Sequence, residues 1–196
     1  MATEIELKAH VKDHEAIKLL LSKKAEYFCA FEKEDSYWLR PENTGSLTRF
    51  RLRREKCILT NGTETFTCFI GYKKKEVNDG IEVNDEREFE IKPGIGAENF
   101  LRELGLEPVI SKRKRGWAWS YEGILAELVE VDGLGWFIEL EILKDEKTPC
   151  DISREESFKE EKKRLLDFIS FLGIEKKAIE SRYYTEMLNI TALAPS

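Results

Sequence analysis

The stretch TEIELKAH, residues 3–10, places the first constraint on the fold. Its charged residues Glu4, Glu6 and Lys8 alternate with aliphatic residues. A β-strand points alternate residues to opposite faces, so this stretch predicts a strand with one apolar face and one charged face. The charged face then meets either water or something that the protein binds.

The same alternation recurs in later segments of the chain. The paired charges that a strand would place on one face are Arg51 and Arg53, Lys73 and Lys75, and Glu139 and Glu141. Arg87 lies in the strand-like NDEREFEI, and a basic run covers residues 112–115. Acids therefore gather on the first and a late strand and bases on the strands between, whereas a solvated face usually mixes both signs.

Length and composition predict a single domain over residues 1–196, with 41% hydrophobic and 36% charged residues, as in soluble globular proteins. No apolar run approaches the roughly 20 residues of a membrane helix, and no signal peptide is visible. We therefore expect a cytoplasmic protein with reduced cysteines and no membrane partner. The net charge of −6 argues against nucleic-acid binding. A homodimer is compatible with the sequence.

The order of predicted elements indicates an α+β protein rich in antiparallel strands. Helices are expected at 13–24, 97–105, 153–172 and 175–188, and strands at 35–39, 47–55, 64–75, 81–91, 108–120, 123–131 and 136–143. A closed or nearly closed sheet would leave few exposed edges. If helices cover its outside, the charged faces point inward.

Two interpretations of those faces follow from the residues alone. An open sheet would simply keep its polar face in water. A closed sheet would hold unpaired charges away from water, which is costly, so a polyanion and divalent cations would have to complete the interior. Arg and Lys suit phosphate oxygens, and clustered carboxylates suit Mg²⁺ or Mn²⁺. The second interpretation predicts metal-assisted triphosphate binding. There is no GxxxxGK[ST] phosphate loop.

Several motifs resemble the CYTH superfamily, the triphosphate tunnel metalloenzymes. The N-terminal ExExK of this family is matched by Glu4, Glu6 and Lys8. FRLRRE, GYKKK, EREFEI, VDGLGWFIELE and ESRYYTEML resemble further family segments, in the family's order and over nearly the whole chain. The resemblance implies an eight-stranded antiparallel closed β-barrel, the triphosphate tunnel, with helices packed outside.

The resemblance also implies roles for individual residues. The divalent metals would be held by Glu4, Glu6, Glu139 and Glu141, with Glu127 standing in for a family Asp at the position of Val129. The triphosphate would be bound by Arg51, Arg53, Lys73, Lys75, Arg87, Arg113, Arg115 and Arg182. Lys8, set among the carboxylates Glu4 and Glu6, would contact phosphate or orient and deprotonate a water.

The activity expected from the resemblance is that of a class IV adenylate cyclase, which converts ATP to cyclic AMP and pyrophosphate with Mg²⁺ or Mn²⁺. The alternative is a triphosphatase acting on inorganic triphosphate, thiamine triphosphate or a nucleoside triphosphate. GYKKKE replaces the K-G-P often seen in cyclases, which leaves this alternative open. A third possibility is a non-catalytic polyphosphate-binding module, although binding alone would need only the bases.

Overall fold

The computed structural model of the chain describes residues 2–41, 50–78, 81–92, 96–145 and 151–193. The strands in these ranges are β1 (Ala2–His10), β2 (Glu26–Leu39), β3 (Phe50–Leu59), β4 (Glu64–Asn78), β5 (Ile81–Ile91), β6 (Glu107–Tyr121), β7 (Ile124–Val131) and β8 (Gly135–Asp145). The helices are α1 (His14–Lys24), α2 (Gly96–Glu103), α3 (Asp151–Phe171) and α4 (Tyr184–Leu193), with a 3₁₀ turn η2 (Lys176–Ala178). The α+β class and the antiparallel sheet of eight strands are confirmed.

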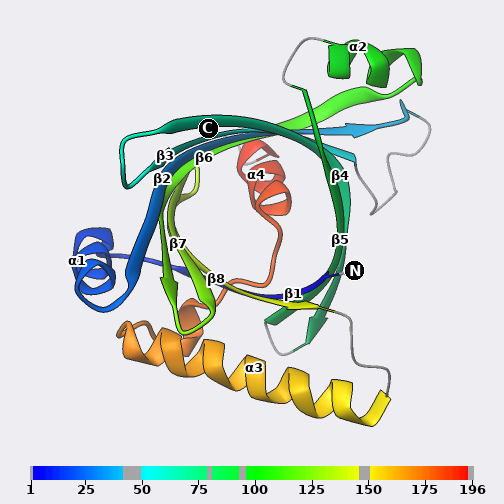
Figure 1. Cartoon of the computed structure of the whole chain (residues 1–196). Coiled ribbons are helices and arrows are strands. Elements are labelled where there is room, and N and C mark those ends of the chain that lie inside the picture. The colour runs from blue at the N-terminus through cyan, green and yellow to red at the C-terminus, as the bar shows by residue number, and fades with distance from the viewer. Residues whose placement is uncertain (1, 42–49, 79–80, 93–95, 146–150, 194–196) are drawn as a thin grey trace.

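The strands follow one another around a closed order, β1-β5-β4-β3-β2-β6-β7-β8. The first strand pairs with two neighbours: Glu4 lies opposite Asn84 of β5, and Lys8 lies opposite Glu139 of β8. Figure 1 looks along the axis of this ring. Because all pairings are antiparallel, alternate residues of each strand point into the lumen and the others point outward.

The outer face of the sheet is apolar where helices cover it. Ile5 and Leu7 of β1 are fully buried there, in a cluster that includes Leu21 of α1 and Ile169 of α3. Figure 1 shows α3 outside the ring, across the side formed by β1 and β8. The shorter helix α2 buries Leu101 in a separate outer cluster. The alternation predicted from TEIELKAH is therefore present, with its apolar face outward and its charged face inward.

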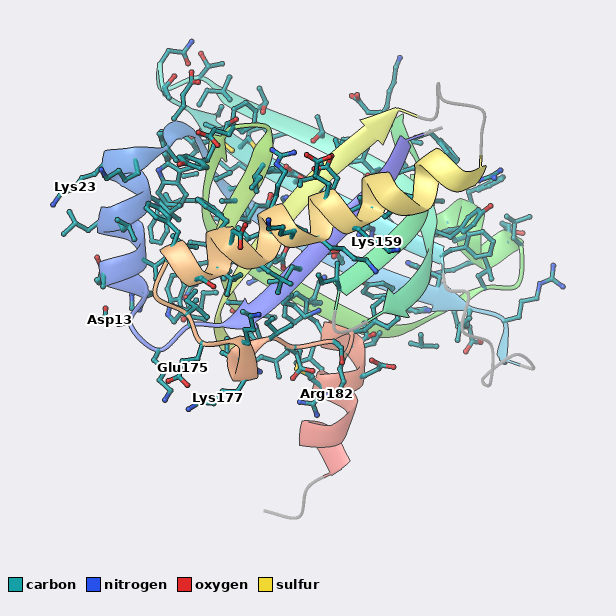
Figure 2. All side chains as sticks on the ribbon, turned by 90° about the horizontal axis from the view of Figure 1, so that it is seen from below. Asp13, Lys23, Lys159, Glu175, Lys177 and Arg182 are labelled. Atoms are coloured by element: carbon teal, nitrogen blue, oxygen red, sulfur yellow. The ribbon has the colours of Figure 1, made fainter. Side chains whose placement is uncertain are left out.

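Helix α4 does not follow the expectation that helices pack outside. Figure 1 shows it in line with the opening of the ring, and Figure 2 shows it projecting from one end of the barrel. Its residues Tyr184 and Met187 pack in an inner cluster with Phe31, Val129 and Phe137. One end of the lumen is therefore filled by apolar side chains and capped by α4, while the other part of the lumen is charged.

Two element boundaries differ from the prediction. Residues 175–188 are not one helix, because Ile179 forms an antiparallel bridge with Ala9 and the Glu180 N–H donates to the Lys8 carbonyl at 2.8 Å. This extended segment docks on β1, which a helical period in the sequence does not reveal. Strand β2 starts at Glu26 rather than at residue 35. Residues 47–49 of the predicted strand at 47–55 lie outside the described part of the chain.

No helix in the described ranges combines the length and the apolar character needed to cross a membrane.

Candidate active site

The lumen contains a cavity of about 400 Å³. Its lining side chains come from the inward positions of the strands and from the start of α4. They are Glu4, Glu6, Lys8, Lys33, Arg51, Arg53, Glu88, Lys112, Lys114, Leu125, Glu127, Glu139, Glu141, Leu143 and Tyr184. Most of these side chains are charged, so the cavity suits a strongly charged ligand rather than an apolar one.

The charges are separated by strand. Acidic side chains of the lining come from β7, β8, β1 and β5, which are consecutive in the closed order: Glu127, Glu139, Glu141, Glu4, Glu6 and Glu88. Basic side chains come from β3, β2 and β6, which are also consecutive: Arg51, Arg53, Lys33, Lys112 and Lys114. The lumen thus has an acidic wall and a basic wall, with Lys8 placed within the acidic one.

Asp35 pairs with two cations of the basic wall. It is fully buried, accepts from Arg53 Nε at 2.7 Å and Nη2 at 3.0 Å, and pairs with Lys112 Nζ at 3.0 Å. Burial acts to raise the pKa of Asp35, but Arg53 and Lys112 outweigh it and hold the pKa well below its usual range. Asp35 therefore stays ionised and fixes two cations that the cavity displays.

A second network joins the two walls. Lys114 Nζ donates to Glu139 Oε2 at 2.6 Å and to Glu127 Oε2 at 3.4 Å, and Lys33 Nζ donates to Glu127 Oε1 at 2.6 Å. Burial opposes charge on Lys114, yet Glu139 and then Glu127 raise its pKa. Lys114, in turn, is the main cause of the low pKa of Glu139. Lys114 and Glu139 are therefore both ionised.

Tyr184 forms the floor of the cavity at the end closed by α4. Its buried ring lies 4.9 Å from Lys8 Nζ and 5.1 Å from Lys112 Nζ, both measured to the ring centroid. Burial and then the nearby Glu139 raise the pKa of its phenol well above the ordinary value, so the hydroxyl stays protonated. Tyr184 thus presents a π face to two ammonium groups where the charged and apolar parts of the lumen meet.

The acidic wall has the donor chemistry of a divalent-cation site. Glu139 Oε1 is buried and accepts no hydrogen bond of normal geometry from the described residues. Within the described ranges, no three acidic, histidine or cysteine side chains lie close enough together to enclose a metal ion. Mg²⁺ commonly takes only one or two protein carboxylates and completes its shell with phosphate oxygens and waters. The residues present therefore fit an ion that enters together with a phosphate ligand.

The structure brings most of the predicted site residues together. All five predicted metal ligands, Glu4, Glu6, Glu127, Glu139 and Glu141, line the cavity, as do Lys8, Arg51 and Arg53. Glu127 makes close contacts with two lysines, so its place in the structure is that of a counter-ion. Val129, at the position of the family Asp, is buried in the inner apolar cluster.

Four predicted phosphate-binding residues lie elsewhere. Arg113 and Arg115 point outward, with side chains 60% and 59% exposed, and pair with Glu34 and Glu130. The cause is strand register: a shift of one residue moves a side chain to the other face, so Lys112 and Lys114 occupy the inner positions.

The other two are Arg87 and Arg182. Arg87 is exposed and precedes the cavity-lining Glu88 in β5, which puts it on the outer face. Arg182, 53% exposed, is held by Glu180 (Nη2 to Oε2 2.6 Å) in the segment leading to α4, and Figure 2 shows it beside that helix. The side chains of Lys73 and Lys75 lie outside the described residues; the backbone register pairs Lys73 with Glu86 and Lys75 with Asn84.

Sequence reasoning assigned no role to Lys33 and Tyr184, and it left the register of the basic run 112–115 open by one residue, so that Lys112 and Lys114 were the alternative to Arg113 and Arg115. A signal for the register of β6 was present two residues later, where Gly116 and Ala118 alternate with Trp117 and Trp119. The tryptophans pack outward toward the helices, and the small residues face inward. A Cβ at Gly116 would lie 2.0 Å from the Leu128 carbonyl oxygen, so β6 and β7 approach closely there. No comparable signal in the sequence points to Tyr184.

The ring of eight antiparallel strands around a charged lumen places the chain in the class of α+β proteins with a closed antiparallel sheet. The chain belongs to the CYTH family, since the CYTH domain model matches residues 2–184. A Methanocaldococcus jannaschii protein whose name proposes adenylate cyclase activity is 26% identical over 185 residues, 94% of this chain and 97% of that protein.

Solved structures agree in fold. The PH1819 protein of Pyrococcus horikoshii has a TM-score of 0.78 at 26% identity, covering 96% of this chain and 99% of that one. A Hippeastrum protein, described in its structure report as an adenylyl cyclase candidate with a dominant triphosphatase activity, has a TM-score of 0.68 at 18% identity, covering 100% and 98%. At that identity the likeness concerns the fold alone.

Proposed function

We propose that this protein is a divalent-metal-dependent phosphoryl-transfer enzyme that acts on a triphosphate, in the manner of a class IV adenylate cyclase. The observation that carries the proposal is the separation of charge across the lumen, with bases on β3, β2 and β6 and acids on β7, β8, β1 and β5, Lys8 of β1 being the base within the acidic wall. A triphosphate needs cations along its chain and a metal on its other side. The name of the archaeal relative supports the cyclase reaction.

The basic wall would bind and orient the triphosphate. Arg53 and Lys112 are held in position by Asp35, so their charges are available without a costly rearrangement. Arg51 lies two residues before Arg53 on the same inner face and would extend the contact along the phosphate chain. These groups would offset the negative charge that grows on the leaving phosphate oxygens.

The acidic wall would hold the metal. Glu4, Glu6, Glu139 and Glu141 are the carboxylates that would take part, together with phosphate oxygens. A bound Mg²⁺ or Mn²⁺ would polarise the phosphate and lower the pKa of the attacking hydroxyl or water. Lys8, buried within this wall and opposite Glu139 in register, would orient the nucleophile.

A triphosphatase is the second candidate, and one observation favours it. Among the described lining residues, Tyr184 carries the one aromatic ring, and two ammonium groups already lie against it. Leu125 and Leu143 are the lining residues with aliphatic side chains. This lining offers little to recognise a nucleobase, whereas inorganic triphosphate would need only the charged walls.

Product analysis tests the proposal. The protein is incubated with Mg²⁺ or Mn²⁺ and, separately, with ATP, inorganic triphosphate and thiamine triphosphate. Cyclic AMP and pyrophosphate from ATP indicate the cyclase, and phosphate release indicates the triphosphatase. Glu4→Gln and Glu139→Gln should each lower turnover by a factor on the order of 100 or more, since one carboxylate of the metal site is lost. Unchanged turnover in both variants, or no product with any substrate, would contradict the proposal.

A further inference from the structure

Lys114 occupies an unusual position between the two walls. It comes from the basic strand β6, but its ammonium group contacts acids of the opposite wall, Glu139 at 2.6 Å and Glu127 at 3.4 Å. Of the other cations of the basic wall, Arg53 and Lys112 pair with Asp35, and Lys33 pairs with Glu127. The hydrogen bond of Lys114 therefore covers one oxygen of Glu139, a carboxylate proposed to hold metal.

The two carboxylate oxygens of Glu139 differ in their hydrogen bonding. Oε2 accepts from Lys114, while Oε1 is buried and accepts no hydrogen bond of normal geometry from the described residues; Lys112 and the Tyr184 hydroxyl also face this carboxyl. An ion placed at Oε1 would lie close to the Lys114 ammonium, and two like charges at this depth repel strongly. Removal of Lys114 from Glu139 would both relieve this repulsion and release the second oxygen.

Glu127 does not depend on Lys114 alone for a counter-charge. It is held by Lys33 at 2.6 Å, so it remains compensated when Lys114 moves away. A triphosphate on the basic wall would offer Lys114 phosphate oxygens in place of Glu139. Because β6 also carries Lys112 in the cavity lining, the same ligand would contact both lysines.

We propose that Lys114 couples the two halves of the site: the ammonium blocks the metal position at Glu139 until a polyphosphate draws it to the basic wall. Metal and polyphosphate then bind cooperatively, and each raises the affinity of the other by the same factor. This inference rests on the proposed function, because it takes the ligand to be a polyphosphate and the acidic wall to hold the metal.

The test measures binding rather than turnover. Mn²⁺ binding is followed by the electron paramagnetic resonance signal of free Mn²⁺, first without any anion, in the wild type and in Lys114→Gln. We expect Lys114→Gln to bind Mn²⁺ at least about fivefold more tightly than the wild type, the low end of typical coupling between sites. Lys33→Gln is the matched control, since it removes the same charge from the same cavity but contacts Glu127 and not Glu139. An equal gain in Lys33→Gln would overturn the inference, because it would reduce the effect to net charge.

The wild type gives a second test that does not depend on the folding of a variant. Tripolyphosphate should raise its Mn²⁺ affinity at least about fivefold, after correction for the Mn²⁺–tripolyphosphate complex measured without protein. An unchanged Mn²⁺ affinity would refute the coupling. Tripolyphosphate binding measured with Mn²⁺ and with a chelator separates the two ideas: no binding in either condition would refute the proposed function, whereas binding that has no effect on Mn²⁺ would refute only the role of Lys114.

Discussion

Asp35 and Arg53 form a two-point ion pair at directly opposite positions of neighbouring strands β2 and β3. The carboxylate has no exposed surface and also holds Lys112. This arrangement fixes two cations of the cavity lining, so Asp35, which is not itself in the lining, determines where their charges lie.

Asp35→Asn should strongly destabilise the protein. The substitution leaves Arg53 and Lys112 buried without a counter-charge, and breaking a buried pair typically costs about 3–5 kcal/mol in the free energy of unfolding. Urea denaturation measures this change. The control is Glu34→Gln, which removes the exposed partner of Arg113 and should cost less than about 1 kcal/mol. Similar losses in the two variants would contradict the anchoring role of Asp35.

Neighbouring residues of β6 should differ sharply in their effect on polyphosphate binding. Lys112→Ala removes an inner cation and should weaken tripolyphosphate binding by a factor on the order of 10, as expected for a charged hydrogen bond. Arg113→Ala removes an outer cation and should change the affinity less than about twofold. Titration calorimetry at constant ionic strength gives both values. A larger loss of affinity in Arg113→Ala than in Lys112→Ala would show that the register assigned to β6 is wrong.

Acid should weaken the attachment of the C-terminal segment to β1. Hydrogen bonds from Arg182 lower the pKa of Glu180 from 4.5 to about 2. The stabilisation is therefore complete above about pH 4.5 and is lost as the pH falls toward 2. Because Arg182 is half exposed, solvent screening keeps this contribution small. The unfolding free energy of Glu180→Gln should depend less steeply on pH in this window, and an identical slope would exclude the pair as the cause.

Tyr184 should matter for stability through its ring and not through its hydroxyl. The hydroxyl makes no hydrogen bond with the described residues that meets normal geometry, so Tyr184→Phe should change the free energy of unfolding by less than about 1 kcal/mol. Tyr184→Ala leaves a cavity beside Phe137 and Met187 and should cost about 3–5 kcal/mol. Thermal unfolding of both variants provides the comparison. Equal losses would show that the hydroxyl supplies the stabilisation.

Alternation in the sequence predicted a large part of the fold and of the site. Glu4, Glu6 and Lys8 point into the lumen because every second residue of β1 must, and a closed order of strands leaves only one interior for them. The same period placed Arg51 and Arg53 inside. These features depend on local geometry, which the sequence carries directly.

Features that depend on contacts distant in the chain were not predictable in this way. Arg113 and Arg115 were assigned inward because four consecutive basic residues hide the register of the strand, and the neighbouring tryptophans settle it only once the outer helices are in place. The segment at Ile179 and Glu180 adopts an extended form because it docks on β1, 170 residues earlier in the chain at the His10–Glu180 contact. Tyr184 reaches the cavity through that docking.

The central claim is that the charged lumen binds a polyphosphate on its basic wall and a divalent metal on its acidic wall. A crystal structure with tripolyphosphate and Mn²⁺ tests it most directly, because anomalous scattering locates the metal independently of the phosphate density. We predict one Mn²⁺ peak within coordination distance of Glu139, with phosphate groups on Arg53 and Lys112. Tripolyphosphate bound outside the lumen, or Mn²⁺ bound away from the acidic wall, would contradict the account.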